Sequence, residues 1–127
     1  MYIDSYFQNR FKMLPGVGIF ISGGTVMKVL VPYLRAKGFK VESVWAPTIE
    51  AAKEAAEELD IPFHTHKIDD VLLKKEVDLV FIMCQPILQK IIAVKALGIG
   101  KHVVCDRPGV NYNFYFETKW FLYFDFN

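Results

Sequence analysis

Cysteine is scarce in this chain, and neither sign of charge is in excess. Cys84 and Cys105 are the only two cysteines among 127 residues, and both follow apolar runs. Such a pair does not make the disulfide framework of a small secreted domain, so we expect buried, reduced thiols in a cytoplasmic protein. The 15 basic and 14 acidic residues leave a net charge of +1. A field this weak excludes recruitment of nucleic acid or of an anionic membrane by overall charge.

Long hydrophobic runs and clustered metal ligands are missing as well. No apolar run approaches the roughly 18 residues that a membrane-spanning helix needs. Polar side chains such as Asp4 and Arg10 interrupt residues 1–12, which therefore lack the apolar region of a signal peptide. His64 and His66 have no third or fourth ligand near them in the sequence, and a loop is the simpler account of that segment. We expect neither a membrane span nor a metal site.

Aromatic residues are concentrated at the two ends of the chain. Of the 19 aromatics, 6 lie in residues 13–108 and 13 lie in the flanks. This distribution predicts a flexible N-terminal extension (residues 1–12), a folded domain (residues 13–108) and an aromatic-rich tail (residues 109–127). Residues 120–126 could pair as an edge strand, cover the open edge of a sheet or remain disordered. The tail could also be non-native sequence.

Residues 13–108 alternate apolar runs with helical patterns. Short runs rich in β-branched residues are typical of buried parallel strands, and they fall at residues 17–21, 41–45, 62–64, 77–83 and 101–105. Apolar residues at helical spacing, with start and stop signals, predict helices at 26–37, 49–59, 68–74 and 86–97. This alternation requires a parallel sheet with right-handed crossovers. We therefore predict an α/β fold, a doubly wound parallel sheet of the Rossmann type with five or six strands.

The first predicted strand runs into a glycine-rich turn, Ser22-Gly23-Gly24-Thr25, and then into a helix. Glycines let the backbone approach a ligand, and the first N–H groups of the helix, with the positive end of its dipole, suit a phosphate. A dinucleotide-binding unit has such a turn after its first strand. The glycines are not spaced as in that fingerprint, so the turn is also compatible with a simple strand-to-helix connection.

Several segments carry a resemblance to a known family. They are residues 14–20 (LPGVGIF), 29–39, 93–101 (AVKALGIGK) and 105–107. In them the chain closely resembles the glucose–fructose oxidoreductase domain-containing proteins, which belong to the superfamily of glucose–fructose oxidoreductase, inositol dehydrogenase and rhizopine-catabolism proteins. The resemblance covers residues 13–108. It implies an N-terminal NAD(P)-binding Rossmann domain and a larger α/β domain that forms the substrate site, and this chain ends before that second domain could begin.

The resemblance places the phosphate-binding turn at residues 22–27. Ser22 stands where the family has its first glycine, Gly24 is the second, and Met27 replaces the small third residue. A serine can manage the tight turn, but Met27 is expected to push the helix away from the strand. Ser22, Gly23, Gly24 and Thr25 are therefore the implied cofactor contacts. We expect binding of NAD or NADP that is weak or lost.

Two later loops complete the implied site. Gln85 and Pro86 follow the fourth strand, where the superfamily's loop touches the dinucleotide, although Pro86 also suits the first turn of a helix. After the fifth strand the family's Glu-Lys-Pro reads Asp106-Arg107-Pro108. Asp106 keeps a carboxylate for the nicotinamide-side ribose. Arg107 takes the place of the implied catalytic lysine, and because a guanidinium stays protonated it cannot pass on a proton, so we expect no catalytic residue in this chain.

The adenosine ribose is read at the end of the second strand of a Rossmann fold. Residues 45–48 contain neither Asp nor Glu for the ribose of NAD, and no arginine is adjacent for a 2′-phosphate. Lys53 could reach this position from the next helix, but it is more typical of a solvated surface charge. The sequence does not choose between NAD and NADP.

Two functions are compatible with these patterns. The first is an NAD(P)-binding module of an oxidoreductase that is not catalytic on its own, with hydride transfer to or from a sugar or polyol-like alcohol implied for the full-length relatives. The second is a non-enzymatic interaction module with a decayed cofactor site. The expected partners are a dinucleotide and, through a sheet surface left exposed, a second copy of the chain or another protein. The family resemblance adds a secreted location as the alternative to the cytoplasm.

Overall fold

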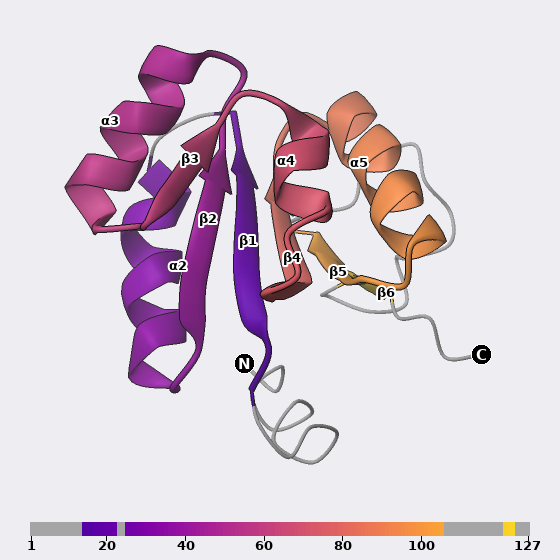
Figure 1. Ribbon diagram of the computed structural model, residues 1–127, viewed down its shortest axis with the longest axis horizontal. Helices are drawn as coiled ribbons and strands as arrows, with labels where there is room; N and C mark the ends of the chain where they lie inside the picture. Colours follow the sequence, from indigo (N-terminus) through magenta and orange to yellow (C-terminus); the bar gives the residue numbers. More distant parts are fainter. Residues whose placement is uncertain (1–13, 23–24, 106–120, 124–127) are drawn as a thin grey trace.

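A single six-stranded sheet organises the chain. The computed structural model describes residues 14–22, 25–105 and 121–123, and its strands are β1 (Gly16–Ile21), β2 (Lys40–Trp45), β3 (Phe63–Thr65), β4 (Val77–Met83), β5 (His102–Cys105) and β6 (Phe121–Tyr123). Their order in the sheet is β3-β2-β1-β4-β5-β6 (Figure 1). Strands β1 to β5 are parallel, and β6 pairs antiparallel with β5. The predicted fold class is confirmed, and residues 121–123 of the tail form an edge strand.

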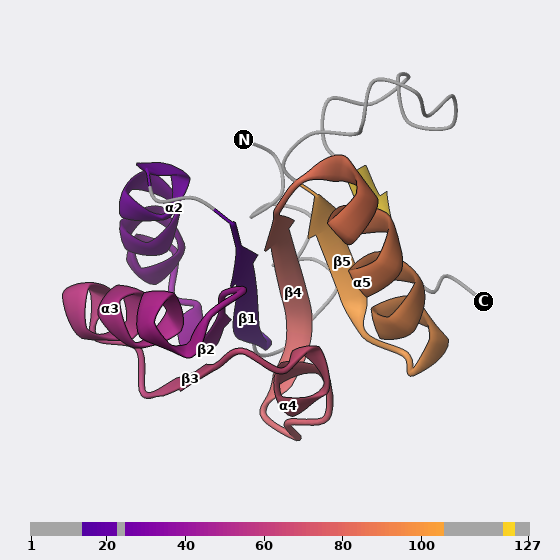
Figure 2. The same ribbon diagram turned by 90° about the horizontal axis from the view of Figure 1, so that it is seen from above.

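Four helices of the described residues cover the two faces of this sheet. Helices α2 (Thr25–Ala36) and α3 (Ile49–Leu59) lie on one face, and α4 (Ile68–Leu72) and α5 (Pro86–Gly98) lie on the other (Figures 1 and 2). Each face has its own cluster of buried apolar residues. The layers are therefore those of a doubly wound fold, and every predicted helix and strand lies within two residues of its observed bounds.

The central strand β1 supplies apolar side chains to both clusters. Val17, Ile19 and Ile21 pack on the face of α2 and α3, and Phe20 packs on the face of α4 and α5. Because alternate side chains of a strand point to opposite faces, a strand covered on both sides needs an unbroken apolar run. This requirement explains why the strand was recognisable from its sequence.

Gly18 of β1 is required by the close approach of α4. A Cβ atom at this position would lie 2.6 Å from Cγ1 of Val71, which belongs to α4 and is fully buried. No ordinary side chain fits at that distance, so glycine lets the short helix seat directly on the middle of the sheet.

The helices begin and end at recognisable residues. The Thr48 side chain accepts a hydrogen bond from the Ala51 N–H at 3.2 Å and so caps α3, as predicted. Pro86 occupies the first turn of α5, where its missing N–H costs nothing. Gly38 follows α2 with a φ of +97°, which glycine adopts without strain. The predicted stop of α5 is displaced, because Gly98 is its last residue and the left-handed residue is Gly100.

The strand order places a topological switch between β1 and β4. From β1 the chain first winds toward β2 and β3, and then returns to continue on the other side with β4 and β5. In open α/β sheets the crevice for a ligand lies outside the carboxyl ends of the strands at such a point. The carboxyl ends of β1, β2 and β4 are therefore where a site is expected.

Candidate functional site

The carboxyl ends of β1 and β4 are joined directly at the switch point. The Ser22 N–H donates a hydrogen bond to the Met83 carbonyl at 3.3 Å. A side-chain hydrogen bond also links Ser22 to the thiol of Cys84. Ser22, which enters the glycine-rich turn, is thus fixed to the neighbouring strand β4, while Gly23 and Gly24 themselves lie outside the described residues.

Cys84, which directly follows β4, is a buried thiol, as predicted, and Cys105 is buried as well. Burial raises the pKa of Cys84 from 9.0 to about 12, and its hydrogen bond with Ser22 partly opposes that shift. Desolvation disfavours the thiolate, so the group is unreactive near neutral pH. The backbone at Cys84 is tied to α5, because Nε2 of the buried Gln89 donates a hydrogen bond to the Cys84 carbonyl at 2.8 Å.

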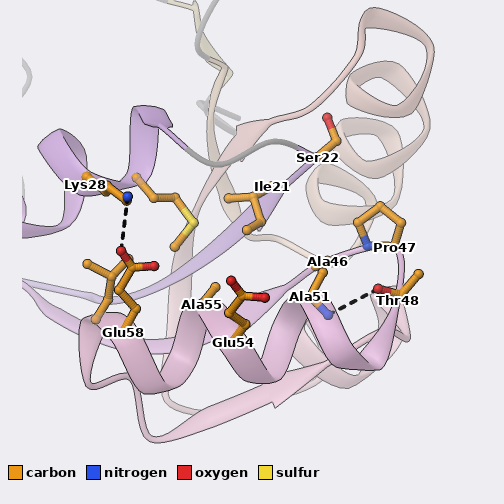
Figure 3. Close-up of a pocket in the computed structure, with 12 residues that line it drawn as sticks. Ile21, Ser22, Lys28, Ala46, Pro47, Thr48, Ala51, Glu54, Ala55 and Glu58 are labelled. Carbon is orange, nitrogen blue, oxygen red and sulfur yellow. Dashed lines mark hydrogen bonds and ion pairs between the residues drawn. The ribbon is translucent and has the colours of Figure 1, made fainter.

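A pocket of about 350 Å³ opens on the other side of β1, between α2 and α3 (Figure 3). It extends from the carboxyl ends of β1 and β2 into the groove between the two helices. Its lining residues are Ile21, Ser22, Met27, Lys28, Ala46, Pro47, Thr48, Ala51, Glu54, Ala55, Glu58 and Leu59. Apolar walls with a few polar groups are typical of small-molecule and cofactor sites.

One face of α3 forms the floor of the pocket. Ala51, Glu54, Ala55 and Glu58 recur at intervals of three and four residues, so they share the side of the helix that looks toward α2. The two alanines leave the space open, and the two glutamates place carboxylates along it (Figure 3). The floor is therefore small and acidic.

A single cation stands among the described lining residues. Nζ of Lys28, on α2, lies 3.2 Å from Oε1 of Glu58, on α3. Both side chains are about half exposed, so the pair contributes little to stability. In the site, the positive charge of Lys28 is therefore already balanced by the Glu58 carboxylate.

The structure distributes the predicted cofactor residues over two places. Ser22 lines the pocket, and Thr25 is the first residue of α2. Gln85 and Pro86 lie at the carboxyl end of β4 and do not line the pocket. Asp106 and Arg107, like Gly23 and Gly24, lie outside the described residues.

Met27, expected to push α2 from β1, is almost completely buried and also forms part of the pocket wall. Lys53 is exposed on α3 and does not line the pocket, which agrees with its interpretation as a surface charge. Sequence reasoning missed Lys28, Glu54 and Glu58. The signal that could have found them is the pairing of small and acidic residues on one face of residues 49–59.

Two further sequence expectations concern metals and membranes. Within the described residues, no group of three or more His, Cys, Asp or Glu side chains is arranged to hold a metal ion. His64 is half-buried in β3 and His66 is exposed after it. Across the same residues, no helix is both long and apolar enough to cross a membrane.

Comparison with known proteins identifies the same type of fold as the strand order does. Residues 16–113 match the model of an oxidoreductase family with an NAD-binding Rossmann fold. The chain is 54% identical over 100 residues to human glucose-fructose oxidoreductase domain-containing protein 2, a match that covers 79% of this chain and 26% of that protein. The chain thus spans about a quarter of the length of the curated relatives it matches.

Solved structures share the architecture. An NAD-binding protein from Listeria innocua matches with a TM-score of 0.62 and 29% identity, over 72% of this chain and 26% of that one. Biliverdin reductase from Synechocystis, solved with biliverdin and NADP+, matches with a TM-score of 0.63 and 25% identity, over 71% of this chain and 28% of that one. The chain belongs to the oxidoreductase family with an NAD-binding Rossmann fold.

Proposed function

We propose that this chain binds the adenosine end of NAD or NADP in the pocket between α2 and α3, as the nucleotide-binding module of an oxidoreductase that is not catalytic on its own. The observation that carries the proposal is the continuity of the pocket, which joins Ser22 at the end of β1 to Ala46, Pro47 and Thr48 at the end of β2. These are the two strand ends that contact the pyrophosphate and the ribose in a dinucleotide-binding unit.

The residues present fit this part of the cofactor. Apolar surface from Ile21, Met27 and Ala46 suits the hydrophobic faces of a nucleoside, and small residues of α3 leave room for its sugar. The turn that begins at Ser22 leads into the N-terminus of α2, which is a favourable place for phosphate charge. When bound, a nicotinamide cofactor supplies hydride chemistry that protein side chains cannot perform.

The absence of independent catalysis is inferred from the sequence. Arg107 stands at the position of the lysine implied to be catalytic in the family, and a guanidinium does not exchange a proton near neutral pH. The substrate site implied by the resemblance belongs to a further domain. The module is therefore proposed to bind the cofactor, with the reacting groups supplied elsewhere.

The direct test is calorimetric titration of the full chain with NADH and with NADPH. Binding of at least one below millimolar concentration is expected, and it is blocked in Ala51→Trp, whose large side chain fills the pocket floor. Lys53→Trp is the matched control, because it adds the same ring to the exposed surface of the same helix outside the pocket. Failure of wild type to bind either dinucleotide below millimolar concentration rejects this function.

The second candidate function is an interaction module, with a second copy of the chain as its partner. It is favoured by α5, where Ile87, Ile91 and Val94 are 69%, 48% and 64% exposed. These positions follow helical spacing and form one apolar stripe on the outer side of the helix. A helix that is apolar on its outer as well as its inner side is typical of one covered by further protein. Self-association without dinucleotide binding would favour this candidate over the first.

A further inference from the structure

We propose that Glu54, on α3, is the carboxylate that accepts hydrogen bonds from the 2′- and 3′-hydroxyls of the adenosine ribose, and that the pocket therefore selects NAD over NADP. This inference rests on the proposed function and adds to it the cofactor preference and the residue that sets it.

The end of β2 lacks the acidic residue that usually binds the adenosine ribose. In dinucleotide-binding units an Asp or Glu at the end of the second strand bonds to the ribose hydroxyls. Here β2 ends at Trp45, and the following residues Ala46, Pro47 and Thr48 offer no carboxylate. A pocket that binds this ribose through a carboxylate must take it from another element.

Helix α3 places such a group in the same pocket. Glu54 lines the pocket together with Ala46, Pro47 and Thr48. The Cα–Cβ bonds of a helix tilt toward its N-terminus, so the Glu54 side chain leaves α3 on the side of the end that Thr48 caps. Ala51, one turn earlier, is too small to block that path. Figure 3 shows the carboxylate rising from α3 into the space beside Ile21 and Ala46.

The Glu54 carboxylate is available for a ligand, whereas the Glu58 carboxylate is not. Among the described residues Glu54 makes no hydrogen bond and no ion pair, while Glu58, one turn later, is paired with Lys28. An ionised carboxylate accepts hydrogen bonds only, and the two adjacent hydroxyls of a ribose are donors that it can bind together. The free carboxylate is also the one nearer to the end of β2.

The charges around the pocket oppose a 2′-phosphate. Lys28 is the only cation among the described lining residues, and Glu58 already neutralises it. Arg35, on the far end of α2, is occupied by the main-chain carbonyls of Leu59 and Asp60. A phosphate on the ribose would therefore meet the Glu54 carboxylate, and no unpaired cation among the described lining residues would offset the repulsion between these like charges.

The test measures the affinities of the full chain for NADH and NADPH by calorimetry, in wild type, Glu54→Gln and Glu57→Gln. Both substitutions remove one negative charge from an exposed position of α3, but Glu57 does not line the pocket. Wild type is expected to bind NADH roughly tenfold more tightly than NADPH or better, the effect of one close charge. In Glu54→Gln that ratio should fall toward one, through weaker NADH and stronger NADPH binding. In Glu57→Gln it should stay as in wild type, and thermal melts should show all three chains folded.

Three results would overturn the inference. If wild type binds both dinucleotides equally, or prefers NADPH, the pocket does not select NAD. If Glu54→Gln and Glu57→Gln change the ratio alike, the effect is one of net charge and not of a contact in the pocket. If neither dinucleotide binds wild type, the proposed function fails and this inference fails with it, which distinguishes that case from the first two.

Discussion

Lys28 Nζ lies 3.2 Å from Oε1 of Glu58, across the groove between α2 and α3. The pair joins the two helices that form the pocket, and its partners are 30 positions apart in the sequence. It holds the lysine ammonium beside a carboxylate at the solvent-exposed end of the pocket, away from the strand ends. The pair therefore leaves Glu54 as the unpaired charge among the described lining residues.

Glu58→Gln is expected to release Lys28 and to improve NADPH binding by several-fold. Once its carboxylate partner is neutral, the flexible ammonium is free to turn toward a 2′-phosphate. The free energy of unfolding should change by less than about 1 kcal/mol, because the pair is solvent-exposed. Calorimetric titration and urea denaturation measure the two effects. An unchanged NADPH affinity would show that Lys28 cannot reach the cofactor.

Gly18→Ala is expected to destabilise the fold by about 1 to 3 kcal/mol, the cost of overpacking a core. Its new methyl group would lie 2.6 Å from Cγ1 of Val71, so α4 or the sheet must move. Urea denaturation measures the loss. The double variant Gly18→Ala, Val71→Ala should lose less than the sum of its two single variants, since the second substitution removes the clashing atom.

Gly98→Ala is the matched control for that substitution. Apart from its chain neighbours and the backbone of its own helix, no described atom lies within 4 Å of a Cβ placed at Gly98, the last residue of α5. The change should be neutral or should stabilise the chain by up to about 1 kcal/mol, because alanine is the better helix former. Equal destabilisation by both alanine substitutions would contradict the steric account of Gly18.

Cys84 predicts a specific loss of stability at alkaline pH. Burial raises its pKa from 9.0 to about 12, so between these values the unfolded chain has released the thiol proton and the folded chain has kept it. Raising the pH through this window therefore favours unfolding, by at most about 1.4 kcal/mol per pH unit for one group. Wild type should lose more stability than Cys84→Ala over this range in urea denaturation series. Parallel curves for the two chains would mean that Cys84 titrates alike in both states.

The fold could be predicted because each of its elements carries a local signal. The run at 17–21 is apolar without alternation because β1 is covered on both faces, and Thr48 and Gly38 mark helix boundaries through their own chemistry. Such signals depend on neighbours in sequence. They suffice for element order, and the order of a strand–helix alternation fixes a parallel sheet.

The pocket could not be predicted in the same way, because it depends on contacts between elements. Glu54 and Glu58 have the sequence pattern of a solvated helix face, and only the packing of α2 beside α3 turns that face toward a cavity. The register of β1 on β2 shifts between Val17 and Gly18, and this local irregularity cannot be predicted from the residue pattern. The glycine-rich turn pointed to the end of β1, whereas the pocket extends from there to the end of β2 and into the groove between α2 and α3.

The exposed stripe of α5 makes a prediction about self-association. If a second copy of the chain covers Ile87, Ile91 and Val94, sedimentation should detect a dimer whose population rises with protein concentration. Val94→Lys should shift the equilibrium to the monomer, because it would bury an unpaired charge in an apolar contact. Val29→Lys is the matched control, since Val29 is 74% exposed on α2, away from this stripe. A wild-type chain that stays monomeric at every concentration would remove the support for the interaction module and leave the dinucleotide site as the function to test.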